Sequence, residues 1–338
     1  MLPKLNYYYE KYKPKLHKHI KTQEERVQNE IRKKYVQIYK SKLYKKSSVI
    51  QTPSTMRSNV SGSLQLDYQK QKNSFSKVVI FDLGETLGSF SELECLWSGL
   101  NEYNILFQNN VILLQKDFNE LIDLYPEFLR YGILGVLEFL CSKKKIGECF
   151  KIYIYTNNQC PSIWTHLIAN YFSYVLKTKS IFDQLVCAFK IKGEVFEEMR
   201  TSHDKSYCDF IRCTMLPNHT EMCFLDNTYF SRMKHDKVYY IQPQAYHHGL
   251  TYTDISSRFE KYPLFKNRSF YDFIKQWFET KGSRCFHRIK SKEEYEIDIL
   301  VSHKMLYHIK EFFFMTTKVI RTKKMRSKLG SFTRKNRS

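Results

Sequence analysis

Residues 77–87 read Lys-Val-Val-Ile-Phe-Asp-Leu-Gly-Glu-Thr-Leu, and this stretch decides the fold. After the leading lysine, the run up to Phe81 is apolar and largely β-branched, which is typical of a strand buried in a parallel sheet. The strand ends at Asp82, and the residues that follow predict a turn. Working outward along the chain, we find other short apolar runs that end in the same way.

Short apolar runs alternate with helix-like segments between residues 77 and 255. The predicted strands are residues 77–81, 150–155, 181–189, 222–225 and 238–241, and the predicted helices are residues 92–142, 162–176 and 205–215. Strands that alternate with helices imply a parallel sheet with helices on both faces. The sequence therefore predicts an α/β, doubly wound fold whose ligand site lies outside the carboxyl ends of the strands.

Polar residues that follow three of these strands indicate phosphate chemistry. They are Asp82, Thr156 and Asp226. A carboxylate can attack phosphorus, and two carboxylates at one sheet edge can hold Mg²⁺, which prefers hard oxygen ligands. A threonine hydroxyl can bind a phosphoryl oxygen, and a lysine can neutralise the transferring group. We choose Lys205 for that lysine because it opens a predicted helix, with Lys190 and Lys192 as rivals.

The order and spacing of these elements resemble the haloacid-dehalogenase (HAD) superfamily of phosphatases. The superfamily's first motif, Asp-x-Asp-x-Thr after an apolar strand, is similar to residues 82–86. Its second motif, a strand that ends in Thr or Ser, is similar to residues 152–156. Its fourth motif, a strand that ends in acidic residues, is similar to residues 223–227, and Lys205 takes the place of the third. The resemblance covers roughly residues 77–250 and implies a three-layer α/β/α core.

One branch of the superfamily looks nearest, the branch that dephosphorylates the C-terminal domain of RNA polymerase II. Its fourth motif often reads Asp-Asn-Ser-Pro, which is similar to Asp226-Asn227-Thr228. Residues 129–132 and 138–140 are a faint likeness of the Arg-Pro-Gly-x-x-x-Phe-Leu stretch of that branch.

The resemblance implies a role for each matching residue. Asp82 would be the nucleophile and a Mg²⁺ ligand, joined by the backbone carbonyl of Gly84 and the carboxylate of Asp226. Asn227 would support Asp226 or a metal-bound water. The residues implied in phosphate binding and catalysis are Thr156, Asn157 and Lys205. We expect a Mg²⁺-dependent phosphatase that forms an aspartyl-phosphate and acts on a phosphoprotein or on a phosphate of nucleic acid.

The chain departs from the resemblance at Gly84. The superfamily's second Asp is the general acid that protonates the leaving group, and this kind of catalysis is worth about 10²–10⁴-fold. Its loss would hurt alkyl phosphates most, whereas aryl and acyl phosphates have leaving groups that need less help. We do not expect Glu85 to replace it, because an adjacent residue in an extended turn points elsewhere. Three interpretations stay open: a slow or specialised phosphatase, an enzyme with a substitute acid, and a catalytically inactive scaffold that binds nucleic acid or protein.

Basic residues gather at both ends of the chain. The net charge of the 338 residues is +21; residues 1–77 carry 18 basic and 5 acidic residues, and residues 315–338 carry 9 basic and none acidic. Such extensions are the usual footprint of a polyanion partner such as nucleic acid, although a solvated tail or a nuclear import signal fits residues 318–337 as well. The predicted organisation is a basic helical extension (1–46), a linker (47–76), the HAD-like domain (77–255) with a small cap or long helical connection (88–130), a helical region (256–317) and a basic tail (318–338).

Composition argues against several other classes of protein. No run of about 18 apolar residues is present, so we expect no membrane span, and the N-terminus lacks the apolar core of a secretory signal. Nine scattered cysteines suggest reduced thiols in an intracellular compartment, cytoplasmic or nuclear, or a virion if the source is a large DNA virus. Zinc is disfavoured because Cys208, Cys213, His219 and Cys223 lack a C-x2-C pair.

Overall fold

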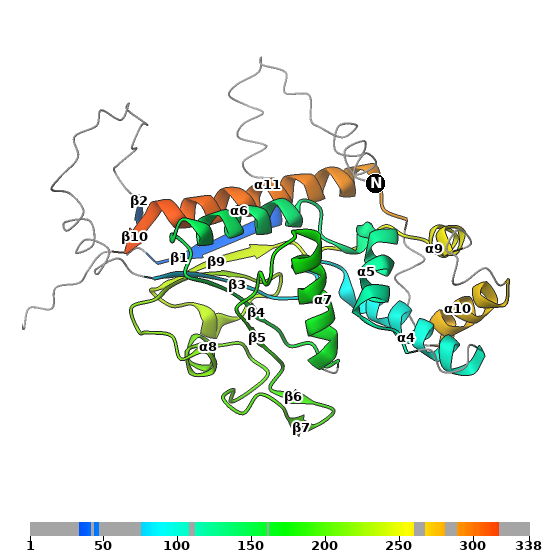
Figure 1. The fold of residues 1–338 in the computed structure, drawn as a ribbon. Helices are drawn as coiled ribbons and strands as arrows, with labels where there is room; N and C mark the ends of the chain where they lie inside the picture. Colours follow the sequence, from blue (N-terminus) through cyan, green and yellow to red (C-terminus); the bar gives the residue numbers. More distant parts are fainter. Residues whose placement is uncertain are drawn as a thin grey trace, which may run out of the picture.

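The computed structural model describes residues 34–41, 44–46, 76–107, 112–160, 162–259, 268–280 and 289–317. Its centre is a six-stranded sheet in the order β1-β9-β8-β3-β4-β5 (Figure 1). The strands are β1 (Val36–Lys40), β3 (Lys77–Phe81), β4 (Lys151–Tyr155), β5 (Gln184–Val186), β8 (Glu221–Leu225) and β9 (Val238–Pro243). Five of them run parallel, and β1 is antiparallel to β9.

The winding of the chain places β3 at the point where the strand order reverses. From β3 the chain moves outward through β4 to β5, and it then returns to β8, on the other side of β3, before moving outward again to β9. Phe81 at the end of β3 pairs with Ile154 of β4 and with Leu225 of β8. The residues that follow these three strands therefore come together at one edge, where ligands bind in sheets of this kind.

Helices cover both faces of the sheet. On one face, Val79 and Phe81 belong to an apolar cluster with residues of α6 (Ile133–Lys145), α7 (Ser162–Val175) and α11 (Lys292–Phe314). On the other face, Val78 and Ile80 belong to a smaller cluster with residues of α8 (Tyr207–Thr214). Both faces of β3 are thus buried, which explains why its sequence is a continuous apolar run rather than an alternation.

A group of helices extends the molecule beyond the carboxyl edge of the sheet (Figure 1). They are α4 (Phe90–Phe107), α5 (Gln115–Leu124), the short 3₁₀ helix Pro126–Phe128, α9 (Tyr252–Phe259) and α10 (Arg268–Thr280). The indole of Trp277 on α10 donates a hydrogen bond to the Cys95 carbonyl on α4 at 3.0 Å. Buried residues of α4 and α5 belong to the larger apolar cluster of the sheet, so these two helices share the core of the domain.

The helical extension expected over residues 1–46 is wrong where the structure describes it as strand. Residues Val36–Lys40 form β1, and residues Tyr44–Lys46 form β2, which pairs with β10 (Met315–Thr317). The physical reason is the open edge of β9, whose backbone groups bond to β1 residue for residue. Local sequence without Gly or Pro favoured a helix, but this distant partner overrides it. Residues 1–33, 47–75 and 318–338, which include most of both basic extensions, lie outside the described residues.

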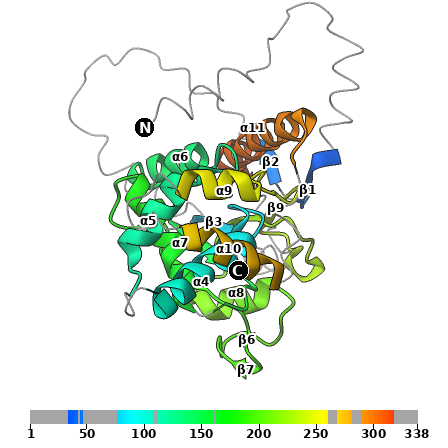
Figure 2. The same ribbon diagram turned by 90° about the vertical axis from the view of Figure 1, so that its right-hand side faces the viewer.

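Two other boundaries differ from the sequence prediction. The strand expected at residues 181–189 is shorter, Gln184–Val186, and is followed by a small hairpin of β6 (Lys190–Ile191) and β7 (Glu194–Val195). Where the structure describes residues 256–317, they are mainly helical as predicted, but Met315–Thr317 form β10. Helix α11 packs on β9 and on α6 and so belongs to the same domain. Figure 2, the perpendicular view, shows α11 and α6 side by side. In the part of the chain that the structure describes, no helix has the length and apolar character needed to cross a membrane.

The contact between α6 and α11 generates a test of the fold. Gly132 caps α6 with a left-handed φ of 71°, and a Cβ there would lie 2.0 Å from Ser302 Oγ of α11. We expect Gly132→Ala to lower the free energy of unfolding by about 1–3 kcal/mol through overpacking. Gly135→Ala on the same helix is the matched control, because its Cβ would meet nothing within 4 Å. It should leave stability unchanged or raise it by about 0.5–1 kcal/mol in urea denaturation. Equal effects of the two substitutions would contradict this packing.

Candidate active site

Asp82 and Asp226 continue two neighbouring strands by one residue each. The Asp82 N–H donates to the carbonyl of Leu225 on β8 at 2.8 Å, and the Asp226 N–H donates to the carbonyl of Ile241 on β9 at 3.2 Å. Because Phe81 and Leu225 are partners in the sheet, the two aspartates stand side by side. The sheet register therefore fixes the spacing of the two carboxylates that the sequence analysis singled out.

Lys205 joins the two carboxylates. Its Nζ lies 2.5 Å from Asp82 Oδ1 and 2.7 Å from Asp226 Oδ2. The side chains of Lys205 and Asp226 are 1% exposed and that of Asp82 is 11% exposed. The three charged groups are therefore buried, and only Asp82 keeps some contact with solvent. Lys205 directly precedes Ser206, the N-cap of α8. The rival candidates Lys190 and Lys192 belong to the β6–β7 hairpin, so Lys205 is the lysine brought to the two aspartates.

The burial of three charges has an electrostatic consequence. Burial raises the pKa of the Asp226 carboxyl; the nearby charge of Asp82 raises it further, whereas Lys205 lowers it. The backbone N–H of Thr228 also donates to Asp226 Oδ1 at 2.8 Å. One ammonium faces two carboxylates, and this imbalance favours a further cation at the group.

The donor set fits the Mg²⁺ ion that the resemblance implies. Mg²⁺ commonly takes one or two protein carboxylates and completes its shell with water and substrate phosphate. Asp82 and Asp226 supply two adjacent carboxylates, one of which is partly open to solvent. Among the described residues, no three His, Cys, Asp or Glu side chains gather as a metal-ligating group. Two adjacent carboxylates, one partly open to solvent, suit an ion that keeps several waters.

Thr156 and Asn157 form a loop that a buried arginine holds. Thr156 is 2% exposed, and its Oγ1 accepts a hydrogen bond from the Asn158 N–H at 3.1 Å. Arg200 donates to the Thr156 carbonyl at 2.9 Å and to Asn157 Oδ1 at 2.6 Å. Its guanidinium also stacks 4.7 Å from the Tyr155 ring. The loop after β4 is therefore fixed by a positive charge whose partners are carbonyl and amide oxygens.

Asn227 ties the loop after β8 to the loop after β3. Its Oδ1 accepts a hydrogen bond from the Thr86 hydroxyl at 2.8 Å, and its backbone N–H donates to the same hydroxyl oxygen at 3.0 Å. Its Nδ2 lies 3.4 Å from Glu85 Oε2. We expected Asn227 to support Asp226 or a metal-bound water, and its observed contacts are with the loop that carries Gly84.

The buried side chain of Arg130 binds the backbone of the loop that carries Gly84. Its guanidinium donates to the carbonyls of Glu85, Thr86 and Gln244 at 2.5, 2.6 and 2.7 Å. Burial lowers the pKa of Arg130 to about 10, which leaves it charged at neutral pH. The contact with Glu85 matters because Glu85 has a left-handed φ of 54°, an uncommon conformation for a residue with a side chain.

Gly84 sits in this loop without any steric need for glycine. Its φ is not in the left-handed region, and a Cβ built on it would meet nothing within 4 Å. The position next but one to Asp82 is therefore open space in which no side chain stands.

No family model, curated protein or solved structure matches this chain.

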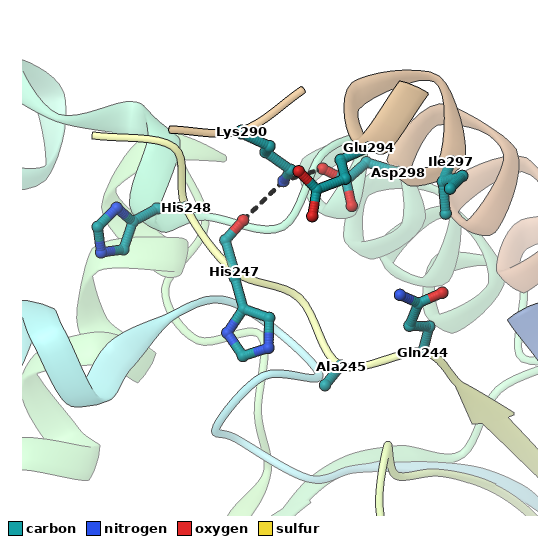
Figure 3. A pocket seen from close by; sticks show the side chains of 8 residues that line it. All are labelled: Gln244, Ala245, His247, His248, Lys290, Glu294, Ile297 and Asp298. Atoms are coloured by element: carbon teal, nitrogen blue, oxygen red, sulfur yellow. Dashed lines mark hydrogen bonds and ion pairs between the residues drawn. The ribbon is translucent and has the colours of Figure 1, made fainter. Parts of the chain in front are cut away.

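A cavity of about 160 Å³ lies behind the same loop (Figure 3). Lys290 Nζ donates to the His247 carbonyl at 2.6 Å and pairs with Asp298, both at the cavity wall. The segment after β9 that lines the cavity is bonded to the loop that carries Gly84, because the Tyr246 N–H donates to the Glu85 carbonyl at 2.9 Å. His247 and His248 both line the cavity, and His248 is buried, with its ring 4.8 Å from that of Phe128.

The cysteines considered as zinc ligands, and the aromatic residue Phe312, lie in different parts of the fold. Cys223 is buried within β8 and Cys208 is exposed on α8, and the eight described cysteines are free thiols. Phe312 is fully buried and packs on Tyr44 and Tyr239, so it belongs to the core.

Sequence reasoning missed the two buried arginines that shape the site loops. Arg130 had been noted only as part of a faint likeness, and Arg200 lies in a loop with no periodicity that would mark it. Thr86 was visible as the threonine of the first motif, but its bond to Asn227 joins residues 141 positions apart in the chain. Such pairings are set by strand order, which the sequence around either residue does not reveal.

The charge group predicts a large effect on stability. We expect Lys205→Met to lower the free energy of unfolding by about 3–5 kcal/mol, because two buried carboxylates lose their cation. Adding Asp226→Asn to this variant should restore part of the loss, since one buried negative charge is removed. Urea denaturation without Mg²⁺ measures both effects, and Lys234→Met at an exposed position is the control. A loss below about 1 kcal/mol would mean that the three groups are not buried together.

Proposed function

We propose that this protein is a Mg²⁺-dependent phosphatase of the HAD type, in which Asp82 is the nucleophile. The observation that carries the proposal is the meeting of Asp82, Asp226 and Lys205 at the carboxyl edge of the sheet, with Lys205 Nζ within 2.7 Å of both carboxylates. The strand order around β3 supports it, because it brings the ends of β3, β4 and β8 to one place. The substrate would be a phosphoprotein or a phosphate on nucleic acid.

Each side chain has a chemical part in this proposal. Asp82 is the partly open member of the charge group, so its carboxylate is the one that an incoming phosphorus can reach. Lys205 would bind the phosphoryl oxygens and lower the charge that repels the carboxylate. The Thr156 hydroxyl and the loop fixed by Arg200 would bind another phosphoryl oxygen. Asp82 and Asp226 would hold Mg²⁺, which offsets phosphate charge when bound.

A second function is favoured by Gly84, where the expected general acid is absent. A scaffold that has lost catalysis would still fold in this way, and its basic extensions would bind a polyanion. The buried charge group argues for the enzyme, because holding two carboxylates and an ammonium out of water costs free energy that an apolar core would avoid. A chain without catalytic use for them gains nothing from that cost.

Hydrolysis of an aryl phosphate with Mg²⁺ tests the proposal. We expect wild-type protein to hydrolyse it and Asp82→Asn to reduce kcat by at least about 10³-fold, because the nucleophile is lost. The matched control is Asp204→Asn, which alters an exposed aspartate next to Lys205 and should retain wild-type activity. Mg²⁺ should also raise the thermal midpoint of the wild type and not that of Asp82→Asn.

Two results would count against the enzyme. If folded wild-type protein and Asp82→Asn both fail to hydrolyse the aryl phosphate, the scaffold is the better description. If Asp82→Asn is as active as Asp204→Asn, the observed hydrolysis does not use this nucleophile.

A further inference from the structure

Among the described residues, the position two places after Asp82 offers no side chain that could donate a proton, and an aromatic ring lies close to Lys205. The ammonium of Lys205 is engaged by two carboxylates, and the Thr86 hydroxyl donates to Asn227. Gly84 contributes no side chain, and the space where one would stand is open. The Glu85 carboxylate, the nearest described acid on this loop, contacts the Asn227 amide, so a phosphate ester that reacts here finds no acid at the position where the superfamily has one.

Leaving groups differ sharply in this requirement. A phenolate is a weak base and departs unaided, whereas the alkoxide of a serine, a threonine or a nucleoside is a strong base that needs a proton in the transition state. The missing donor thus selects among the substrates of the proposed phosphatase. It disfavours nucleic acid and phosphoserine and favours an ester of a phenol.

An aromatic platform stands beside the charge group. The Phe230 ring centroid lies 5.3 Å from Lys205 Nζ, and the neighbouring Tyr229 is 40% exposed. Tyr229 lies 4.8 Å from the ring of Tyr39 on β1 and stacks 5.8 Å from that of Tyr240 on β9. The rings of Tyr39, Tyr229 and Tyr240 therefore support one another, and Phe230, next to Tyr229 in the chain, lies against Lys205.

The platform is also held rigidly. The Tyr240 hydroxyl donates to the Thr228 carbonyl at 2.5 Å and accepts from the Phe230 N–H at 3.1 Å. Gln242 donates to the Asn227 carbonyl at 3.1 Å, and Tyr39 donates to Gln242 at 3.1 Å. The loop between Asp226 and Phe230 is thus pinned by β9, so a metal-binding carboxylate and an aromatic surface are positioned together. An aryl group can stack on such a surface in offset or edge-to-face geometry.

We propose that the substrate of this site is an aryl phosphate, specifically a phosphotyrosine side chain of a protein. The inference rests on the proposed phosphatase function and narrows it. The Asp82 carboxylate oxygen forms a bond to phosphorus while the bond from phosphorus to the phenol oxygen breaks, and the electron pair leaves with the phenolate. The phenolate takes a proton from water. A second water then attacks phosphorus, releases inorganic phosphate and regenerates the carboxylate, so the net reaction consumes one water.

The test compares peptides of one sequence that carry phosphotyrosine, phosphoserine or phosphothreonine, with full-length protein and Mg²⁺. We expect kcat/KM for phosphotyrosine to exceed that for the other two by about 10²–10⁴-fold. A series of aryl phosphates with phenols of graded acidity should show rates that rise steeply with acidity. Gly84→Asp, for which the structure has room, should flatten that dependence and raise phosphoserine hydrolysis.

A substitution at Tyr229 tests the role of the aromatic platform separately. Tyr229→Ala should raise KM for the phosphotyrosine peptide roughly 2- to 10-fold and leave the KM for acetyl phosphate, which has no ring, unchanged. Tyr307→Ala removes another exposed tyrosine, on α11, and serves as the control.

The outcomes separate this inference from the function on which it rests. Hydrolysis that depends on Asp82 but treats phosphoserine and phosphotyrosine alike would overturn the aryl assignment and leave the phosphatase intact. A flat dependence on phenol acidity that becomes steep in Glu85→Gln would also overturn it, because Glu85 would then be the donor. No hydrolysis of any substrate, equal to Asp82→Asn, would overturn the phosphatase and the aryl assignment together.

Discussion

The structure depends on one interaction, the contact of the Lys205 ammonium with the carboxylates of Asp82 and Asp226. Charges of this kind are stable away from water only when each has a close partner, since the desolvation penalty of an ion amounts to several kcal/mol. Here one positive charge is shared between two negative ones. The group therefore keeps an excess of negative charge, which under the proposed function a bound metal ion would offset.

The backbone around this group is arranged to keep it in place. The sheet register sets the two aspartates side by side, and α8 begins at the residue after Lys205. Two buried arginines, Arg130 and Arg200, bind mainly backbone carbonyls of the loops that follow β3 and β4. Because carbonyl groups do not neutralise them, these arginines add positive charge near the sheet edge, and this charge favours an anionic ligand. Arg130 and Arg200 thus both fix the conformation of the site loops and supply positive charge near them.

The sequence predicted the parallel sheet well because its strands are apolar runs that end in polar residues. It placed Asp82, Thr156 and Asp226 after strands by the same reasoning, and it chose Lys205 because that residue opens a predicted helix. It failed at β1, because a wider stretch without Gly or Pro was interpreted as a helix, although Val36, Ile38 and Tyr39 favour a strand and the open edge of β9 pairs with them. It could not reveal Arg200 or the platform of Tyr39, Tyr229 and Tyr240, because their neighbours are distant in the chain and are set by the strand order. The pattern of apolar and polar residues predicts helices and strands, whereas contacts between distant residues depend on how the strands are ordered in the sheet.

The measurement that bears most directly on the nucleophile is ¹⁹F NMR of the full-length protein with Mg²⁺ and beryllium fluoride, which binds an aspartate as an analogue of its acyl phosphate. Wild-type protein should give resonances of the bound fluoride complex that require Mg²⁺ and are absent from Asp82→Asn. Asp204→Asn should give the same spectrum as the wild type. Bound resonances that persist in Asp82→Asn, or that fail to form in folded wild-type protein, would contradict the assignment of Asp82 as the residue that receives the phosphoryl group.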